Sequence, residues 1–546
     1  MLKNIFPTLT VKEYRELAKE ISDLKNNPAS ILSNDSPAIP EKTDQLFFKY
    51  NEYQKALQRN KAFDFDDLIM QPIILFNTHP DIKQKYQEKF LYISIDEYQD
   101  INSAQYKLMQ QLTTPETNLL VIGDPDQAIY GFRGSDRKFF LQFKKDFPDA
   151  KVFRLEKNYR SDSTILKASS QIIKKNSDHQ QINIWSNFFS DTRIDIFQTP
   201  SEKSEAETIV HQIEKMVGAT SFFSVDSGRA GENENDVDSG FSEIAVLYRT
   251  RAQLFALEEA FLRSGIPYQT FGDVPFYEIP EVKEIISFLK VIQNPHSEIN
   301  LHRIINIPPR GIGEQTLNIL MKYQKDNEIS LWQAMERSHY IAVLSTTQKQ
   351  PIEHFVKTVE HIQAKLPKIK IIELIELILN KFGFNSYFKN DKKRQHYWQE
   401  IKKKTESGEE LNKFLERITL QKETDCFNPK AEKVALMTLH AAKGLEFSVV
   451  FIAGCEEGLI PFHKKKKPID IEEERRLFYV GMTRAKRRLI LLHAKSRFLF
   501  GERKSNPVSR FLNDIEQALK ENRLAQIKDK QKPKAQPEDK SQMELF

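Results

Sequence analysis

Two adjacent carboxylates follow a short apolar run in the stretch LYISIDEYQD, residues 91–100. Asp96 and Glu97 stand where the run ends, and Gln99 and Asp100 come next. A β-strand that delivers an Asp-Glu pair to its C-terminal end is a typical way to hold Mg²⁺ on a nucleotide and to polarise an attacking water. Asp96 would reach the metal and Glu97 the water. An Asp-Glu pair after a strand is also common on ordinary surfaces, so the pair alone leaves both interpretations open.

A second polar loop follows another apolar run, in VIGDPDQAIYGFRGSD, residues 121–136. Gln127 could bridge a water, a γ-phosphate and a neighbouring domain. Tyr130 and Phe132 could offer flat faces to nucleic-acid bases, with Arg133 as a phosphate contact. Packing of these aromatic rings in a core explains the same pattern equally well.

Three later stretches carry further groups that suit a nucleotide. LEKNYRS (155–161) contains a Tyr-Arg pair that could stack on a purine and touch a phosphate. TLHAAKGLEF (438–447) is an expected strand that runs into a polar turn. EEERRLFYVGMTRAKRRLIL (472–491) places Arg484 after an apolar segment. An arginine that a second domain delivers to a γ-phosphate stabilises the charge of the transition state.

These groups lie at the ends of short, continuous apolar runs, which alternate with helical patterns. Such runs predict buried parallel strands in an α/β fold. One group of runs lies before about residue 155, and the other is divided between about 190–275 and about 430–500. The segment between the two halves of the second group is helical in pattern and predicts an inserted helical domain. The expected strands are 91–96, 118–124, 243–249, 434–440 and 448–454.

Composition fits a soluble chain of several domains. A chain of 546 residues is too long for one hydrophobic core. Its composition, 40% hydrophobic and 29% charged, is typical of a soluble globular protein. No apolar stretch approaches the roughly 20 residues of a membrane helix, and the start lacks a signal-peptide pattern. Cys426 and Cys455 form no disulfide framework and no metal-binding spacing. We therefore expect a cytoplasmic protein that does not enter a membrane.

Charge allows nucleic-acid binding without requiring it. The net charge is +5, and HKKKKP (463–468) is a local basic run that fits either a solvated loop or a nucleic-acid contact. Residues 217–240 are rich in Gly, Ser, Asp and Asn and predict a mobile surface loop.

Between about Phe63 and about Leu512, nine stretches resemble the UvrD/PcrA/Rep-type superfamily 1 DNA helicases in their amino-acid sequences and in their order. The stretches are FDFDDLI, IDEYQD, IGDPDQAIYGFRGSD, LEKNYRS, LYRTRAQ, VPFYEIPEVKEI, PPRGIGEQTL, TLHAAKGLEF and EEERRLFYVGMTRAK. The resemblance implies an α/β fold of two RecA-like motor domains of the P-loop NTPase type, 1A and 2A, with helical accessory domains 1B and 2B. It implies ATP and Mg²⁺ as cofactors, and single-stranded DNA and single-strand/double-strand junctions as partners.

The resemblance also implies domain boundaries. They are 1–62 for a remnant of 1B, 63–154 for a partial 1A, 155–275 for the first part of 2A, 276–428 for the 2B insertion, 429–515 for the second part of 2A, and 516–546 for a disordered tail.

Residue roles follow from the matching motif positions. The implied catalytic residues are Asp96, which also holds Mg²⁺, Glu97, Gln127, Arg160 and Arg484. The implied nucleotide contacts are Tyr159 at the adenine, Glu446 at the ribose, and Gly444. The implied DNA contacts are Tyr130, Phe132, Arg133, Arg249 and His440, together with Arg310, Gly311 and Gly313 of PPRGIG (308–313) at the duplex backbone.

The chain departs from the family at the phosphate-binding loop GxxxxGK[ST]. None of its 18 glycines is followed by lysine. The resemblance begins within 1B, so we expect the first half of 1A, with that loop, to be absent. A truncated gene, a split gene and a missed start all remain open, and a separate N-terminal fragment is an expected partner.

The sequence therefore predicts an ATP-dependent 3′–5′ DNA helicase of DNA repair or replication, inactive as this chain alone. The alternative is a non-catalytic DNA-binding or regulatory module that keeps 2A and 2B. A helicase–nuclease is disfavoured because only about 55 residues follow the last motif. The C-terminal QMELF places Gln542, Leu545 and Phe546 as in short peptides that dock on a sliding clamp, although a random polar tail is also possible.

Overall fold

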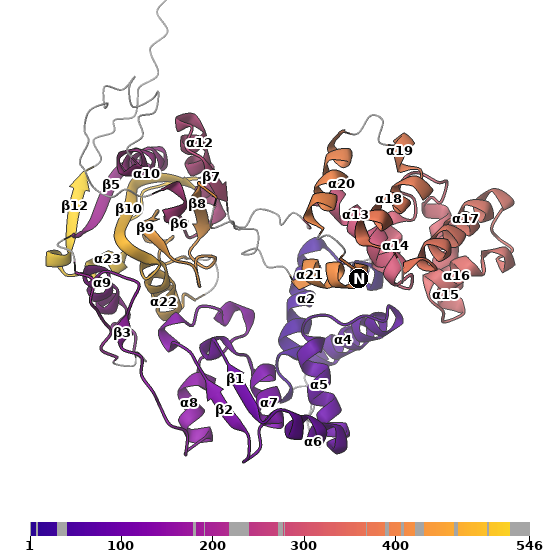
Figure 1. Ribbon diagram of the computed structural model, residues 1–546, viewed down its shortest axis with the longest axis horizontal. Coiled ribbons are helices and arrows are strands. Elements are labelled where there is room, and N and C mark those ends of the chain that lie inside the picture. Colours follow the sequence, from indigo (N-terminus) through magenta and orange to yellow (C-terminus); the bar gives the residue numbers. More distant parts are fainter. Residues whose placement is uncertain are drawn as a thin grey trace, which may run out of the picture. The chain divides into compact units, whose positions relative to one another are not determined.

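The computed structural model (Figure 1) describes residues 2–6, 9–29, 41–177, 179, 182–189, 192–217, 240–270, 277, 279–366, 369–387, 392–405, 409–420, 431–463, 468–499 and 502–524. The chain divides into two compact units. The first unit comprises Met1–Asp124, Tyr130–Phe143 and Asp273–Cys426, and the second comprises Pro125–Ile129, Lys144–Gly272 and Phe427–Phe546.

An eight-stranded sheet forms the centre of the second unit. Its strands are β5 (Ile194–Ser201), β6 (Ile244–Tyr248), β7 (Tyr268–Thr270), β8 (Val434–Thr438), β9 (Phe447–Ile452), β10 (Ala485–Leu499), β11 (Glu502–Lys504) and β12 (Lys520–Leu524). Seven strands run parallel in the order β12-β5-β10-β9-β6-β8-β7, and β11 pairs antiparallel with β10. The strands expected over 243–249, 434–440 and 448–454 are confirmed as β6, β8 and β9. Every residue of β6 and β9 is buried, as in parallel sheets that are covered on both faces.

Helices cover the two faces of this sheet (Figure 1). On one face, α10 (Glu202–Val217) and α12 (Leu254–Ser264) share a core with alternate strand residues such as Val246 and Phe451. On the other face, α22 (Ile471–Met482) approaches closely at Gly481, where a Cβ would clash with Leu439. Helix α9 (Ser163–Ile173) packs beside α22. The second unit is therefore a three-layer α/β domain, as the sequence predicts.

Shorter elements complete the second unit. They are η2 (Pro125–Gln127), β3 (Lys157–Asn158), β4 (Trp185–Ser186), η4 (Phe241–Glu243), η5 (Arg251–Gln253), α23 (Arg510–Asn513) and η11 (Gln517–Leu519). The assignment of residues 516–546 to a disordered tail is wrong at its start. Residues 520–524 form β12, which pairs with β5 and is fastened by an ion pair of 2.9 Å between Arg523 and Asp195.

The first unit contains a two-stranded parallel sheet of β1 (Tyr92–Ile95) and β2 (Asn118–Val121). The neighbouring helices are α5 (Asp67–Thr78), α6 (Pro80–Lys89), α7 (Ser103–Leu112) and α8 (Lys138–Asp146), which runs on across the division between the units. The expectation of strands at 91–96 and 118–124 is confirmed, and their burial differs from that of the strands in the second unit. Tyr92 is 81% exposed and Leu120 50%, because within the described residues the sheet ends after two strands.

A helical core forms the rest of the first unit. Helix α13 lies at its centre and buries Val282, Ile285, Phe288 and Leu289 completely. The helices of this part are α13 (Pro280–Gln293), α14 (Glu298–Ile304), α15 (Glu314–Asp326), α16 (Leu331–Glu336), η7 (Ser338–Tyr340), α17 (Thr346–Gln363), α18 (Ile371–Lys381), α19 (Phe384–Tyr387), α20 (Lys392–Lys404) and α21 (Leu411–Leu420). The helical pattern predicted for this segment is thus confirmed.

Three N-terminal helices, α1 (Leu2–Ile5), α2 (Val11–Lys25) and α4 (Glu41–Arg59), pack together. Lys25 is fully buried and pairs with Asp64 at 2.6 Å and Asp67 at 2.8 Å. Both acids belong to the FDFDDLI stretch, so that motif ties α2 to the start of α5.

Among the residues that the structure describes, no helix combines the length and the apolar composition that a membrane crossing requires. The loop predicted at 217–240, apart from its end residues, lies outside the described residues. So do Lys464–Lys467 and the C-terminal positions Gln542, Leu545 and Phe546.

Candidate functional site

In the first unit, Asp96 and Glu97 follow β1 directly, and both are exposed. Glu97 has a left-handed backbone conformation with φ of 52°, and its N–H donates to Asp96 Oδ1 at 2.8 Å. This conformation costs a non-glycine residue on the order of 1–3 kcal/mol and is concentrated at functional sites. The turn directs two carboxylates away from the strand end, where oxygen ligands for Mg²⁺ are expected.

Gln99 holds the Glu97 side chain. It lies in η1 (Tyr98–Asp100), is only 1% exposed, and donates from Nε2 to Glu97 Oε2. Its Oε1 accepts the Asp124 N–H at 3.0 Å, and Gly123 has no Cβ to block this approach. Gln99 therefore connects the carboxylate to the loop after β2. The residue was not predicted as part of the site, although its place two positions after Glu97 was the available signal.

The predicted aromatic loop in the first unit clusters around Arg133. Its guanidinium carbon lies 5.2 Å from the Tyr130 ring centroid and 5.5 Å from that of Phe132. Phe132 is 56% exposed, so its ring is not core packing. Phe132 and Arg133 lie in η3 (Gly131–Arg133) and are exposed, and the half-buried Tyr130 precedes it, so the three side chains form an aromatic and cationic surface.

In the second unit, the structure brings Gln127, Lys443 and Arg484 together. Arg484 is 2% exposed and donates from Nε to Val480 O at 2.9 Å and from Nη2 to Gln127 Oε1 at 3.4 Å. Lys443 Nζ donates to the backbone oxygen of Gln127 at 3.0 Å. Gly444 follows with φ of 85°, a turn that favours glycine. Two predicted residues far apart in the sequence, Gln127 and Arg484, thus converge, and Lys443, which was not predicted, joins them.

Glu446 forms ion pairs with two further cations, Arg160 and Lys486. It accepts from Arg160 Nε at 2.7 Å and from Lys486 Nζ at 2.7 Å. These hydrogen bonds, with Lys486 first and Arg160 second, lower the pKa of Glu446, so the carboxylate stays ionised. Arg160 also approaches the Thr483 oxygen at 3.4 Å, beside Arg484. The cluster therefore presents arginine, lysine and amide donors together with one carboxylate.

The turn that carries Tyr159 and Arg160 is fixed by Asn158. Its Oδ1 accepts the N–H groups of Arg160 at 2.9 Å and Ser161 at 2.8 Å. Tyr159 is 73% exposed, which leaves its ring accessible to a flat ligand.

Two predicted DNA contacts in the second unit, Arg249 and His440, are half-buried and do not lie on an open surface. Arg249, after β6, makes a bidentate ion pair with Glu474 at 2.6 and 3.1 Å and lies 4.9 Å from the Phe462 ring centroid. Its charge is thus already compensated within the unit. His440 lies just after β8 and is half-buried.

Arg310, which the resemblance implies as a contact of the duplex backbone, is held by groups of its own unit. Its guanidinium donates to the Ile304 and Ile305 oxygens at 3.0 and 3.1 Å and lies among the rings of Phe288, Phe355 and Phe382. Burial lowers the pKa of Arg310 to about 10.

In this structure Arg310 supports the PPRGIG loop from inside. The loop itself stays accessible, because Gly311 and Gly313 are exposed and Gly311 has φ of 80°.

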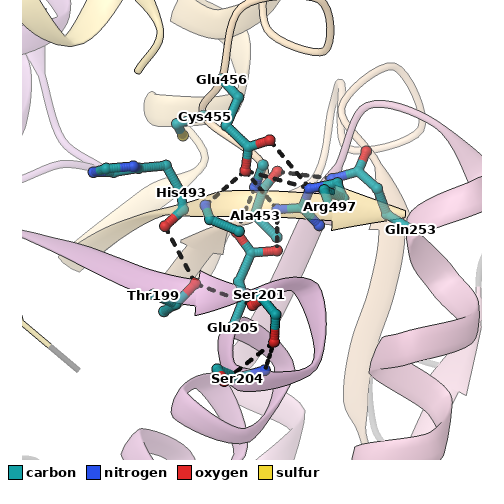
Figure 2. A network of polar contacts seen from close by, with 12 residues as sticks. Thr199, Ser201, Ser204, Glu205, Gln253, Ala453, Cys455, Glu456, His493 and Arg497 are labelled. Atoms are coloured by element: carbon teal, nitrogen blue, oxygen red, sulfur yellow. Dashed lines mark hydrogen bonds and ion pairs between the residues drawn. The ribbon is translucent and has the colours of Figure 1, made fainter. Parts of the chain in front are cut away.

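A buried charge network lies at the carboxyl edge of the second-unit sheet (Figure 2). Arg497 pairs with Glu205 at 2.7 Å and with Glu456 at 2.7 Å, and all three are buried. Glu205 also accepts the Gly454 N–H at 3.0 Å. Burial, with the second carboxylate adding to it, raises the pKa of Glu205 to about 7. The network joins α10, β10 and the loop after β9, and nothing in the local sequence predicted it.

The fold and these groups define a class of protein. It is an α/β protein with RecA-like organisation, in which arginine, lysine and acidic side chains gather at strand ends as at the sites of P-loop nucleotide-dependent motors.

Family models then identify the chain. The model of the UvrD/REP helicase N-terminal domain matches residues 2–148, and that of the UvrD-like helicase C-terminal domain matches residues 153–496. The chain belongs to the UvrD/Rep helicase family.

Two curated relatives agree with this assignment. The chain is 36% identical over 541 residues to the ATP-dependent DNA helicase PcrA of Staphylococcus aureus strain Mu50, covering 96% of this chain and 71% of the relative. It is 37% identical to the ATP-dependent DNA helicase PcrA of Staphylococcus epidermidis strain ATCC 12228, and the match covers 96% of this chain and 72% of the relative. A crystal structure of the C-terminal domain of a possible DNA helicase from Lactobacillus plantarum matches 20% of this chain and 58% of that chain, with 23% identity and a TM-score of 0.13.

Proposed function

We propose that this chain supplies most of an ATP-dependent DNA helicase that moves 3′ to 5′ in DNA repair or replication. The observation that carries the proposal is the convergence of Gln127, Arg160, Arg484 and Glu446 in the second unit. Arginine donors that are held in place, as the buried Arg484 and the half-buried Arg160 are here, stabilise charge that develops on a transferring phosphoryl group. The names of the PcrA relatives, ATP-dependent DNA helicases, support the same activity.

The residues would divide the work as follows. Asp96 would hold Mg²⁺, and Glu97 would orient and polarise the water, with Gln99 holding Glu97 in place. No group of three or more His, Cys, Asp or Glu in the described part of the chain forms a metal cage. A Mg²⁺ on Asp96 would take its other ligands from phosphate and water, as Mg²⁺ commonly does.

The nucleotide itself would be held by the second-unit residues. Arg160, Arg484 and Gln127 would contact the γ-phosphate, Tyr159 would stack on the adenine, and Glu446 would bind the ribose near Gly444. The arginines fit phosphate because their planar forks donate several hydrogen bonds at once.

DNA would bind to several surfaces. Tyr130, Phe132 and Arg133 would stack on bases and contact phosphate in single-stranded DNA, with Arg249 and His440 as second-unit contacts. The exposed Gly311 and Gly313 of the PPRGIG loop would meet the duplex backbone at a junction, with Arg310 as support.

We further propose that residues 1–546 by themselves hydrolyse ATP at or near background. They contain no G-K-[S/T] sequence, and such a loop would supply the backbone N–H groups and the lysine that hold the phosphates. The exposed edges of the β1–β2 sheet suit a partner polypeptide that supplies further strands together with such a loop.

The experiment compares DNA-stimulated ATP hydrolysis by residues 1–546 alone and by the complemented chain, which we define as residues 1–546 with a co-expressed polypeptide that carries the phosphate loop. Activity of the complemented chain, lost in Glu97→Gln, supports the proposal. Glu97-dependent turnover by residues 1–546 alone would overturn the part of the proposal that concerns the loop.

The absence of the G-K-[S/T] sequence also favours a second candidate, a non-catalytic DNA-binding module that keeps domains 2A and 2B. A complemented chain that binds junction DNA but neither hydrolyses ATP nor unwinds DNA would establish it.

A sliding clamp is a further proposed partner. Gln542, Leu545 and Phe546 would dock there as an amide and two apolar anchors. Titration of a peptide of residues 535–546 against the cognate clamp tests this, and the absence of binding at hundreds of micromolar would reject it.

A further inference from the structure

Two short segments of the second unit are paired beside the turn that carries Tyr159. Strand β3 (Lys157–Asn158) runs parallel to β4 (Trp185–Ser186), with Lys157 opposite Trp185. The Trp185 N–H donates to Glu156 O at 3.0 Å, and the Ser163 N–H donates to Phe188 O at 2.9 Å. The segment around Trp185 is therefore fastened along both ends of the Tyr159 turn.

The Lys157 ammonium is shared by two aromatic rings. Its Nζ lies 5.0 Å from the ring centroid of Tyr159 and 5.3 Å from that of Trp185. Both distances are within the range in which a cation is attracted to the face of a ring. Tyr159 and Trp185 are 73% and 44% exposed, so neither ring is held by a core. The shared cation therefore links the exposed Tyr159 ring to the Trp185 ring.

We propose that Lys157 and Trp185 are positioning residues for nucleotide binding, which hold the Tyr159 ring for stacking on a purine base. The inference rests on the proposed contact of Tyr159 with adenine. An ammonium that occupies one face of the tyrosine ring leaves the opposite face for a planar base. Trp185 also contacts the ammonium and holds it in place. The Tyr159 side chain is then partly ordered before the base binds, so it loses less conformational entropy on binding.

A purely structural role for these residues makes a different prediction. If Lys157 and Trp185 only stabilised the β3–β4 pair, their replacement would lower stability and leave nucleotide affinity unchanged in the folded protein. If they position Tyr159, replacement of Lys157 would weaken nucleotide binding only while Tyr159 is present.

Tryptophan fluorescence provides a direct readout. The chain has three tryptophans, and the other two, Trp332 and Trp398, are 3% exposed in the helical core of the first unit. Titration of ADP into residues 1–546 and into the complemented chain should therefore change the emission of Trp185. We expect a saturable change that disappears in Trp185→Phe, because phenylalanine keeps a ring but removes the indole signal.

Affinity is then measured by calorimetry with ADP. Lys157→Met should raise the Kd about two- to fivefold, the size that an exposed cation–π contact corresponds to. Lys157→Arg should retain most of the affinity, and Trp185→Phe should be closer to the parent chain than Trp185→Ala. Lys167→Met on α9 is the matched control, since Lys167 is exposed and contacts neither ring.

The decisive step is a double-mutant cycle. Lys157→Met should have no further effect on ADP affinity in the Tyr159→Ala background, because the two residues act together. Equal effects of Lys157→Met in both backgrounds, or no ADP-dependent change in Trp185 emission, would overturn the inference. A nucleotide response with the expected cycle, in a complemented chain that hydrolyses no ATP, would retain the inference while rejecting the proposed helicase activity.

Discussion

Arg484 donates a hydrogen bond of 3.4 Å to the side-chain oxygen of Gln127, although 357 positions separate the two residues. The guanidinium is also held by Val480 O and by Thr483 Oγ1, so its orientation is set before any ligand arrives. Gln127 is held in turn by Lys443 through its backbone oxygen. Such a preorganised donor stabilises developing charge without reorganisation, which is the property that phosphoryl transfer requires.

The first prediction concerns Arg484. Arg484→Ala should lower kcat for ATP in the complemented chain by about 10²–10³-fold, the usual cost of removing one preorganised donor at a transition state. Because Arg484 is buried, the change also removes its hydrogen bonds to Val480 O and Leu445 O, and we expect a loss of stability of about 1–3 kcal/mol. Steady-state kinetics and urea unfolding measure the two effects. A folded Arg484→Ala chain with normal kcat would contradict the assignment.

The second prediction concerns Gln99. Gln99→Ala should lower kcat of the complemented chain by up to about 100-fold with little change in KM, because Glu97 loses the group that orients it. In the Glu97→Gln background the same change should have no additional effect on the residual rate. The matched control is Gln105→Ala, since Gln105 is an amide that caps α7 in the same unit. A fall in kcat for the control equal to that for Gln99→Ala would indicate a general loss of structure.

The third prediction concerns DNA binding. Phe132→Ala should weaken binding of single-stranded DNA by about 1–3 kcal/mol, the value of stacking one base on an aromatic ring. Arg133→Ala should weaken binding and lower the slope of log K against log salt concentration by about 1, which corresponds to the loss of one phosphate contact. Phe255→Ala is the control, because Phe255 is 75% exposed in the second unit and has no proposed contact with DNA. Fluorescence anisotropy at several salt concentrations measures all three, and an affinity that is insensitive to Phe132, Arg133 and salt would reject the surface.

Sequence reasoning succeeded where the signal is local. The apolar runs that became β6, β8 and β9 needed only their composition, because residues buried on both faces of a parallel sheet are apolar at every position. The convergence of Gln127 with Arg484 was implied by the resemblance of their motifs. The aromatic loop at Phe132 could be assigned to the surface only in the structure, since its composition fits a core equally well.

Sequence reasoning failed where a partner lies far away in the chain. The surroundings of Arg310 could not be predicted from its glycine-rich loop, because Phe288, Phe355 and Phe382 come from elsewhere in the chain. The pair of Glu205 and Arg497 is separated by 292 positions, and neither residue lies in a recognisable motif. Strand β12 was missed because its charged residues lie at the edge of the sheet, where the apolar pattern is weak.

The last prediction concerns pH and the network of Glu205, Glu456 and Arg497. One guanidinium compensates two buried carboxylates, which leaves an excess negative charge in a place where charge is costly. The pKa of Glu205 is accordingly raised to about 7 from an ordinary value of 4.5, so the folded chain binds a proton there that the unfolded chain releases. Since the folded state binds more protons in this range, the free energy of unfolding should fall as pH rises from about 4.5 to about 7 and should level off above that.

Glu205→Gln tests this prediction, because glutamine imitates the protonated carboxyl group without titrating. Compared with the parent chain, it should show a smaller decrease in unfolding free energy between pH 5 and pH 7, with a difference of a few kcal/mol at most. Glu259→Gln is the matched control, since Glu259 is exposed on α12 of the same unit and pairs only weakly with Lys203 at 3.6 Å. Urea unfolding at several pH values in this range, followed by a signal from the second unit, gives the slope of unfolding free energy against pH for each chain. If the parent chain and Glu205→Gln have the same slope, Glu205 is ionised throughout this range in the folded protein, and Arg497 alone compensates both carboxylates.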